Sequence, residues 1–166
     1  MKDLDFFTWR RECSLRFQEL TCAAEVYQEL ERQTQALEFD YYALCVRHPV
    51  PFTRPKISLH TTYPKLWMAQ YQSANYFAID PVLKPENFIQ GHLPWTDALF
   101  AEAQELWHSA QDHGLRAGIT QCLMLPNHAL GFLSVSRSRV QEGPLAHEEI
   151  ELRLQMLVQM ALTSLM

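Results

Sequence analysis

The chain of 166 residues has no long hydrophobic run, and its longest stretch of consecutive apolar residues is Tyr41–Val46. A helix needs about 20 apolar residues to cross a bilayer, so we expect no membrane span. The sequence does not open with a basic head followed by an apolar stretch, so we expect no secretory signal. Five glycines and nine scattered prolines are too few and too irregular for a collagen-like or low-complexity chain.

Cysteine is also scarce, with four residues at positions 13, 22, 45 and 122. None of them forms a C-x-x-C pair, so zinc-knuckle and thioredoxin-like sites are not supported. Cys45 lies in the apolar run and is most simply a small buried hydrophobe. A chain of this length does not need disulfides to fold. We therefore expect a reduced protein of the cytoplasm.

Basic residues are outnumbered, 14 against 19 acidic, which gives a net charge of −5. Phosphate contacts need clustered Lys and Arg, so we expect no direct nucleic-acid contact by this segment. The hydrophobic share of 48% is typical of one globular domain. Residues 1–47 and 101–166 each carry a net charge of −3, whereas residues 48–100 carry +1 and hold nine aromatic residues. Composition therefore places a binding pocket, if there is one, in the middle of the chain.

Catalytic signatures are missing as well. The seven histidines are scattered without an H-E-x-x-H motif, no serine lies in a G-x-S-x-G elbow, and no glycine-rich phosphate loop is present. We therefore expect no enzyme activity, no catalytic residue, no metal site and no cofactor. Residues from distant segments can still converge, so an enzyme acting on an acyl lactone or acyl ester remains the alternative.

Apolar spacing predicts helices at both ends of the chain. The opening stripe runs through positions 13, 17, 20, 24 and 27, and the closing stripe runs through positions 150, 154, 157, 161 and 165, with Pro144 as the helix start. Alternating or β-branched runs predict strands at 39–46, 57–62, 119–125 and 131–137, and a short one at 76–79. Prolines at 49, 51 and 55 predict a loop, and Pro126-Asn127-His128 predicts a hairpin between the last two strands.

Three further helices are expected between the strands. One begins at Pro64 and ends near Ser73, and another begins at Asp80-Pro81. A longer helix is capped by Thr96 or Asp97 and ended by His113-Gly114, where glycine supplies the left-handed conformation. Helices at the ends with hairpin-linked strands between them predict an antiparallel sheet with helices packed on its faces.

Tyr63, Trp67 and Tyr71 are four residues apart and lie along one face if the helix begins near Tyr63. A core stripe is the ordinary interpretation of such a triplet. Here all three side chains carry a polar tip, and buried Tyr O–H and Trp N–H groups need partners. Three donors on an apolar wall suit a ligand with an apolar body and a few carbonyls.

Three other positions have two interpretations each. Asp80 either caps the helix begun by Pro81, the commoner role, or accepts a ligand N–H. Trp95 is equally consistent with a core position and with a ring beneath a ligand. Ser134 shares a strand face with Phe132, and it is solvated unless helices cover that face, in which case it reaches a ligand carbonyl.

The order and spacing of these motifs resemble the autoinducer-binding domain of LuxR-type quorum-sensing regulators. The resemblance covers essentially the whole chain, residues 1–166, and is carried by Trp67-x-x-x-Tyr71, Asp80-Pro81, Pro94-Trp95 and Gly114-Leu-Arg-Ala-Gly-Ile-Thr. It implies an α/β/α sandwich with a central five-stranded antiparallel sheet. It also implies an N-acyl homoserine lactone bound between the sheet and the helices on one side.

By this resemblance Trp67 donates its indole N–H to the lactone carbonyl, and Asp80 accepts the amide N–H. Tyr63 and Ser134 bond the amide carbonyl region. Tyr71 and Trp95 pack against the ligand. The family pattern further implies that Gly118 allows a turn at the start of the strand beside the pocket.

The sequence departs from the family pattern in two places. Gln121-Cys122 stands where members often carry a proline, and no helix-turn-helix module follows the last helix. We therefore expect an isolated sensory domain of a longer regulator that binds DNA through the missing module, and the resemblance is compatible with a homodimer. A lactonase or acyltransferase, and a protein-interaction domain that uses its terminal helices, are the competing hypotheses.

Overall fold

The computed structural model describes residues 5–49, 56–88, 91–126, 128–140 and 145–165. They form three layers, with one antiparallel sheet between two layers of helices. The five strands follow the order β2-β1-β5-β4-β3. Their bounds are β1 Tyr41–His48, β2 Lys56–Thr61, β3 His92–Pro94, β4 Ala117–Met124 and β5 Leu130–Arg137. The predicted α/β/α sandwich with a five-stranded antiparallel sheet is confirmed.

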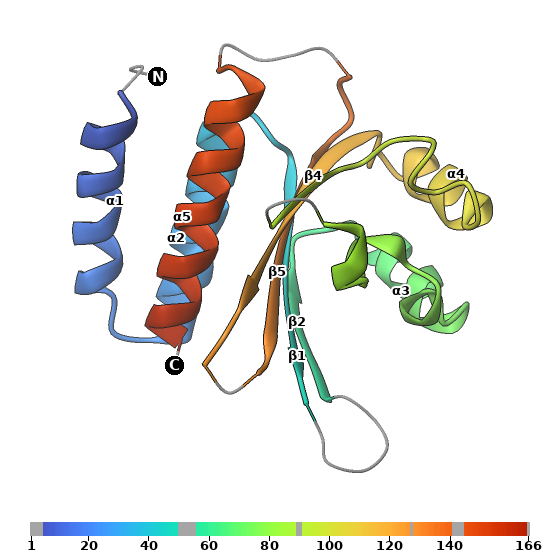
Figure 1. Cartoon of the computed structure of the whole chain (residues 1–166), viewed down its shortest axis with the longest axis horizontal. Helices are drawn as coiled ribbons and strands as arrows, with labels where there is room; N and C mark the ends of the chain where they lie inside the picture. Colours follow the sequence, from blue (N-terminus) through green and yellow to red (C-terminus); the bar gives the residue numbers. More distant parts are fainter. Residues whose placement is uncertain (1–4, 50–55, 89–90, 127, 141–144, 166) are drawn as a thin grey trace.

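Long helices cover one face of the sheet and shorter ones cover the other (Figure 1). The first set comprises α1 Phe6–Glu19, α2 Ala23–Ala36 and α5 His147–Leu165. The second comprises α3 Lys65–Ser73 and α4 Gln104–Asp112 with the 3₁₀ turns η1 Tyr76–Ala78, η2 Pro81–Leu83 and η3 Pro85–Asn87. None of the helices in these described ranges is long and apolar enough to span a membrane.

The strand alternation builds a separate core on each face. In β5, Leu133 and Val135 belong to the core beneath α1, α2 and α5. Phe132 and Ser134 point to the opposite side, toward α3 and α4. The predicted division of this strand between two faces is therefore correct, and both faces are covered.

The predicted single opening helix is wrong, because the chain breaks between α1 and α2. Glu25 accepts hydrogen bonds from the Thr21 backbone N–H at 2.8 Å and from the Thr21 hydroxyl at 2.7 Å, which fixes the start of α2. The apolar face changes register at this break, so that Ala24 is exposed while Val26 and Leu30 are buried. The helical spacing of apolar residues in the sequence continues across residues 20–24 although the helix itself ends there. This spacing alone therefore does not distinguish one helix from two.

Two predictions in the middle of the chain are also wrong. Residues 76–79 form a 3₁₀ turn instead of a strand, because Ala78 and Ile79 donate backbone bonds within the turn. Neither Thr96 nor Asp97 caps α4, which begins only at Gln104. Thr96 closes an earlier turn, whereas Asp97 accepts the Trp107 indole N–H at 2.7 Å.

The four longer strands were predicted to within two residues of their observed bounds, whereas the helix expected from Asp80-Pro81 is only the 3₁₀ turn η2. Gly114, which follows the His113 cap of α4, has φ +92°, the left-handed conformation expected after a helix end. The hairpin between β4 and β5 is present, although Asn127 lies outside the described residues. Pro144, Pro51 and Pro55 also lie outside them. The described part of the last helix begins at His147.

Candidate ligand-binding site

A cavity lies between the sheet and the layer of α3, α4 and the 3₁₀ turns. All six residues predicted for a ligand site line it: Tyr63, Trp67, Tyr71, Asp80, Trp95 and Ser134. Its free volume is about 60 Å³, counted as the space open to the centre of a water molecule. The structure therefore brings together residues that come from four separate stretches of the sequence.

The aromatic triplet enters the cavity from α3 and the turn before it. Because α3 begins at Lys65, Tyr63 contributes from the preceding turn, where its N–H donates to the Thr61 hydroxyl at 3.0 Å. Trp67 and Tyr71 lie one turn apart on the inner face of α3, with ring centroids 5.7 Å apart in an edge-on arrangement. Both side chains are buried. The triplet is thus at once a packed stripe and a cavity wall.

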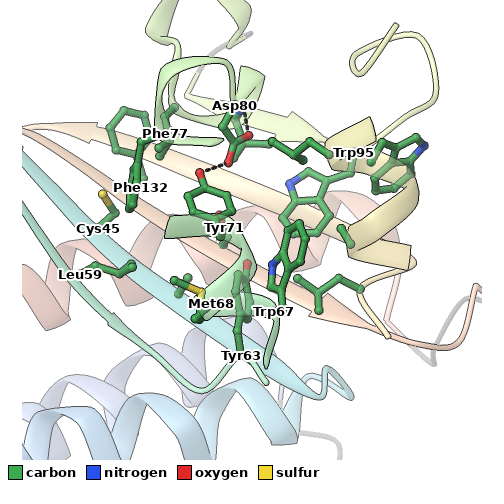
Figure 2. Close-up of a pocket in the computed structure, with 18 of the residues that line it drawn as sticks. Cys45, Leu59, Tyr63, Trp67, Met68, Tyr71, Phe77, Asp80, Trp95 and Phe132 are labelled. Carbon is green, nitrogen blue, oxygen red and sulfur yellow. Dashed lines mark hydrogen bonds between the residues drawn. The ribbon is translucent and has the colours of Figure 1, made fainter. Parts of the chain in front are cut away.

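Asp80 combines the two roles that the sequence left open, a helix cap and a cavity carboxylate. Its Oδ1 accepts the Val82 N–H at 3.0 Å, which caps η2. Its Oδ2 accepts the Tyr71 hydroxyl at 2.5 Å within the cavity (Figure 2). Burial raises the pKa of Asp80 to about 6, although the hydrogen bonds from Tyr71 and Val82 act in the opposite direction.

The two tyrosines that face Asp80 are held in their protonated form. Burial raises the pKa of Tyr71 far above its ordinary value, and the negative charge of Asp80 raises it further. The pKa of Tyr63 is raised by the same two causes, while a hydrogen bond from Ser134 lowers it in part. Both phenols therefore stay protonated at neutral pH, and the Tyr71 proton is donated to Asp80 while that of Tyr63 can be donated to a ligand.

Trp95 follows β3 and lies over β4. Its backbone N–H donates to the Gly118 carbonyl at 2.9 Å, and its indole N–H donates to the Thr120 hydroxyl at 2.9 Å. A Cβ at position 118 would lie 2.5 Å from the Trp95 ring. Gly118 therefore permits this close approach from within β4, which corrects the turn that the family pattern implied.

Ser134 is buried, so the solvated interpretation of this residue is wrong. Its hydroxyl lies 2.7 Å from the Thr120 hydroxyl on the neighbouring strand. Sequence reasoning missed Thr120, because only the pairing of β4 with β5 places it directly opposite Ser134.

The rest of the cavity is apolar. Figure 2 shows this part of the wall, which includes Cys45, Leu59, Met68, Phe77 and Phe132. Burial raises the pKa of Cys45 to about 12, so its side chain is a neutral thiol at physiological pH. Sequence reasoning did not assign these residues to the cavity, although Cys45 is the small buried side chain expected from its apolar run.

The indole of Trp67 differs from the other three. The indole N–H groups of Trp9, Trp95 and Trp107 each donate to a side-chain oxygen. The structure gives no such bond to the indole of Trp67 within the described residues, although this side chain is only 2% exposed and lines the cavity. An indole N–H that lines the cavity and has no acceptor among the described residues can donate to a group inside the cavity.

The chain is similar to known ligand-sensing regulatory proteins. A family model described as the autoinducer binding domain matches residues 23–165. The regulatory protein SdiA of Escherichia coli (strain K12) is 60% identical over 166 residues, which is 100% of this chain and 69% of SdiA. The HTH-type quorum-sensing regulator RhlR of Pseudomonas aeruginosa is 38% identical over 158 residues, which is 95% of this chain and 66% of RhlR.

Among solved structures, SdiA in complex with octanoyl-rac-glycerol matches with a TM-score of 0.93 at 59% identity, covering 99% of this chain and 67% of that one. The fold and the site thus define a ligand-sensing domain of the class found in quorum-sensing transcription regulators. The chain belongs to the autoinducer-binding domain family. These relatives are named as regulators, so the enzyme alternative has no support from them.

Proposed function

We propose that this domain binds an N-acyl homoserine lactone in the cavity between the sheet and the α3/α4 layer. In this proposal Trp67 donates its indole N–H to the lactone carbonyl, and Asp80 accepts the amide N–H. Tyr63 and Ser134 donate to the amide carbonyl. Tyr71 and Trp95 pack against the ligand as the walls of the cavity.

The observation that carries the proposal is the pairing of the Trp67 donor with the Asp80 acceptor in one apolar cavity. The Trp67 indole has no hydrogen bond within the described residues, whereas Asp80 is a buried carboxylate. Tyr71 occupies only part of the capacity of Asp80, because a carboxylate offers about four lone-pair positions. A lactone carbonyl and an amide N–H on one small head group are complementary to this pair.

The apolar wall suits the acyl chain of such a ligand. Each buried CH₂ group contributes about 0.8 kcal/mol, so a medium-length chain supplies several kcal/mol of binding. The free volume of about 60 Å³ is small, so in our proposal the ligand moves the surrounding side chains apart as it enters. Occupancy is thereby coupled to the packing of the α3/α4 layer.

We further infer that the domain is the sensory part of a longer regulator. The chain spans about two thirds of the length of SdiA and RhlR, and RhlR is named as an HTH-type regulator. In this proposal a helix-turn-helix module outside the chain binds DNA in the cytoplasm as part of a homodimer. With its net charge of −5, the sensory segment does not itself contact DNA.

The test is a thermal melt of the domain with a series of N-acyl homoserine lactones of increasing chain length. Solvent extraction followed by mass spectrometry first establishes that the preparation is free of ligand. A ligand at a hundredfold excess over its Kd adds about 2.7 kcal/mol of stability. At about 2–4 °C per kcal/mol for a domain of this size, the melting temperature rises by roughly 5–10 °C.

No rise with any member of the series contradicts the sensor proposal. The same mixtures are analysed for lactone hydrolysis and acyl transfer. Intact ligand is the expected result, whereas accumulating product favours the enzyme alternative.

A further inference from the structure

A buried chain of hydrogen bonds runs behind the cavity wall from Trp95 through Thr120 to Ser134. The Trp95 indole nitrogen lies 2.9 Å from the Thr120 hydroxyl oxygen, which lies 2.7 Å from the Ser134 hydroxyl oxygen. Trp95 and Ser134 line the cavity, whereas Thr120 does not. Thr120 has no exposed surface. It is therefore a link between two cavity residues, out of reach of a ligand.

The direction of these bonds follows from the chemistry of the three groups. An indole N–H only donates, so Thr120 accepts from Trp95. If Ser134 also donated to Thr120, the proton of the Thr120 hydroxyl would be buried without an acceptor, because the described residues provide it with no third partner. Such an orphaned donor is unfavourable. Thr120 therefore donates to Ser134, and the serine keeps its own proton for another acceptor.

We propose that Thr120 is a positioning residue that fixes Ser134 as a hydrogen-bond donor to the ligand, an inference that rests on the proposed function. The Trp95 indole sets the direction of the whole relay, because its N–H cannot be reversed. The cavity wall at Ser134 therefore presents a proton and selects ligands that place a carbonyl oxygen there. An amide carbonyl and an ester carbonyl both satisfy it.

Tyr63 and Ser134 both line the cavity. Their side chains interact closely enough for Ser134 to lower the pKa of Tyr63 in part, against the larger effect of burial. A ligand carbonyl that enters between them receives protons from both hydroxyls.

The first experiment tests the relay without any ligand. Thr120→Val removes the hydroxyl and nearly keeps the shape of the side chain, whereas Thr120→Ser retains the hydroxyl. The probe is the indole ¹H–¹⁵N resonance of Trp95, assigned by its loss in Trp95→Phe. We expect it to move upfield and to exchange faster in Thr120→Val, and to stay in place in Thr120→Ser.

The indole resonances of Trp9 and Trp107 are internal controls, because they donate to Gln33 and Asp97 outside the relay. If these two resonances show that Thr120→Val does not fold, Thr120→Cys replaces it, since a thiol is only a weak acceptor. An unchanged Trp95 resonance in a folded variant overturns the relay.

The second experiment measures affinity for N-octanoyl homoserine lactone by calorimetry. We expect Thr120→Val to bind the lactone about tenfold more weakly than the wild type, a difference of about 1.4 kcal/mol, and Thr120→Ser to bind it within about twofold of the wild type. The affinity of Ser134→Ala should fall about as much as that of Thr120→Val. The double variant Thr120→Val/Ser134→Ala should lose no more than Ser134→Ala alone, because Thr120 acts through Ser134.

Additive losses in the double variant, or unchanged affinity in Thr120→Val, overturn the positioning role. If the wild-type domain does not bind the lactone, the proposed function fails. The Trp95 resonance then still tests whether Thr120 accepts the indole N–H of Trp95.

Discussion

Replacing Asp80 by asparagine separates its contribution to stability from its contribution to ligand binding. The asparagine keeps a side-chain oxygen that accepts the Val82 N–H, so the cap of η2 is retained. It removes the negative charge and places an amide where Oδ2 now accepts the Tyr71 hydroxyl. The same change therefore acts on the fold and on the site in opposite directions.

The effect on stability follows from the raised pKa of Asp80. The carboxyl has an ordinary pKa of 3.8 and a pKa of about 6 in the folded protein, so the folded state binds the proton more tightly. Below pH 3.8 the ionisation of Asp80 therefore does not change the free energy of unfolding. It lowers that free energy progressively between pH 3.8 and 6, and by its full amount above pH 6. At 1.36 kcal/mol per pKa unit the full cost is roughly 3 kcal/mol.

Asparagine does not ionise, so the ligand-free Asp80→Asn variant should be more stable than the wild type at pH 8, by up to roughly 3 kcal/mol. The difference should shrink toward pH 4, where the wild-type carboxyl is largely protonated. Thermal melts of both proteins at pH 4, 6 and 8 measure this trend. A wild type that is more stable than the variant at pH 8 refutes the claim that burial of the Asp80 charge destabilises the fold.

The effect on binding has the opposite sign. Hydrogen bonds to charged groups contribute roughly 1.5–3 kcal/mol, against about 1 kcal/mol for neutral pairs. Asp80→Asn should therefore lose on the order of tenfold in affinity for N-octanoyl homoserine lactone, about 1.4 kcal/mol. Calorimetric titration at pH 8 measures the loss. Unchanged affinity would show that Asp80 only caps η2 and would remove it from the proposed ligand site.

Three further predictions concern pH, packing and DNA. Calorimetry should show the lactone affinity of the wild type falling several-fold between pH 7 and 5 as Asp80 is protonated. The affinity of Asp80→Asn should change little over the same range. The same pH dependence in both proteins contradicts the role of Asp80 as an acceptor. Gly118→Ala should weaken lactone binding and lower the melting temperature, because the added Cβ meets the Trp95 ring. In the control Gly131→Ala, the added Cβ meets the end of Leu162 on the opposite face of the sheet, so lactone affinity should be unchanged. Equal losses of affinity in the two variants argue against a specific role for Gly118. The fragment alone should give no mobility shift with duplex DNA at physiological salt, and a salt-sensitive shift would show that the sensory segment itself contacts DNA.

The parts of the fold that were predictable from the sequence depend on local periodicity. The alternation in β5 assigned Phe132 and Ser134 to one face and Leu133 and Val135 to the other, and the structure confirms it. Helical spacing likewise placed Trp67 and Tyr71 on one inner face. These features repeat over two to four residues, so neighbouring sequence is sufficient to show them.

The features that sequence reasoning missed depend on contacts between distant segments. Thr120 becomes a partner of Ser134 only through the register between β4 and β5. Asp97 appeared to be a helix cap, but its carboxylate instead accepts the indole N–H of Trp107 on α4. The break between α1 and α2 leaves a helical apolar spacing in the sequence, so periodicity alone did not reveal it.

The two faces of the sheet divide stability and sensing between them. The core beneath α1, α2 and α5 is built mainly from aliphatic side chains such as Leu154 and Leu157, and the cavity does not reach it. The core beneath α3 and α4 consists largely of aromatic rings such as Trp67, Phe100 and Trp107, and these same rings line the cavity. In the proposed function, a ligand in the cavity adds contacts to these surrounding rings. A ligand can thus order the α3/α4 layer while the opposite core holds the sheet together.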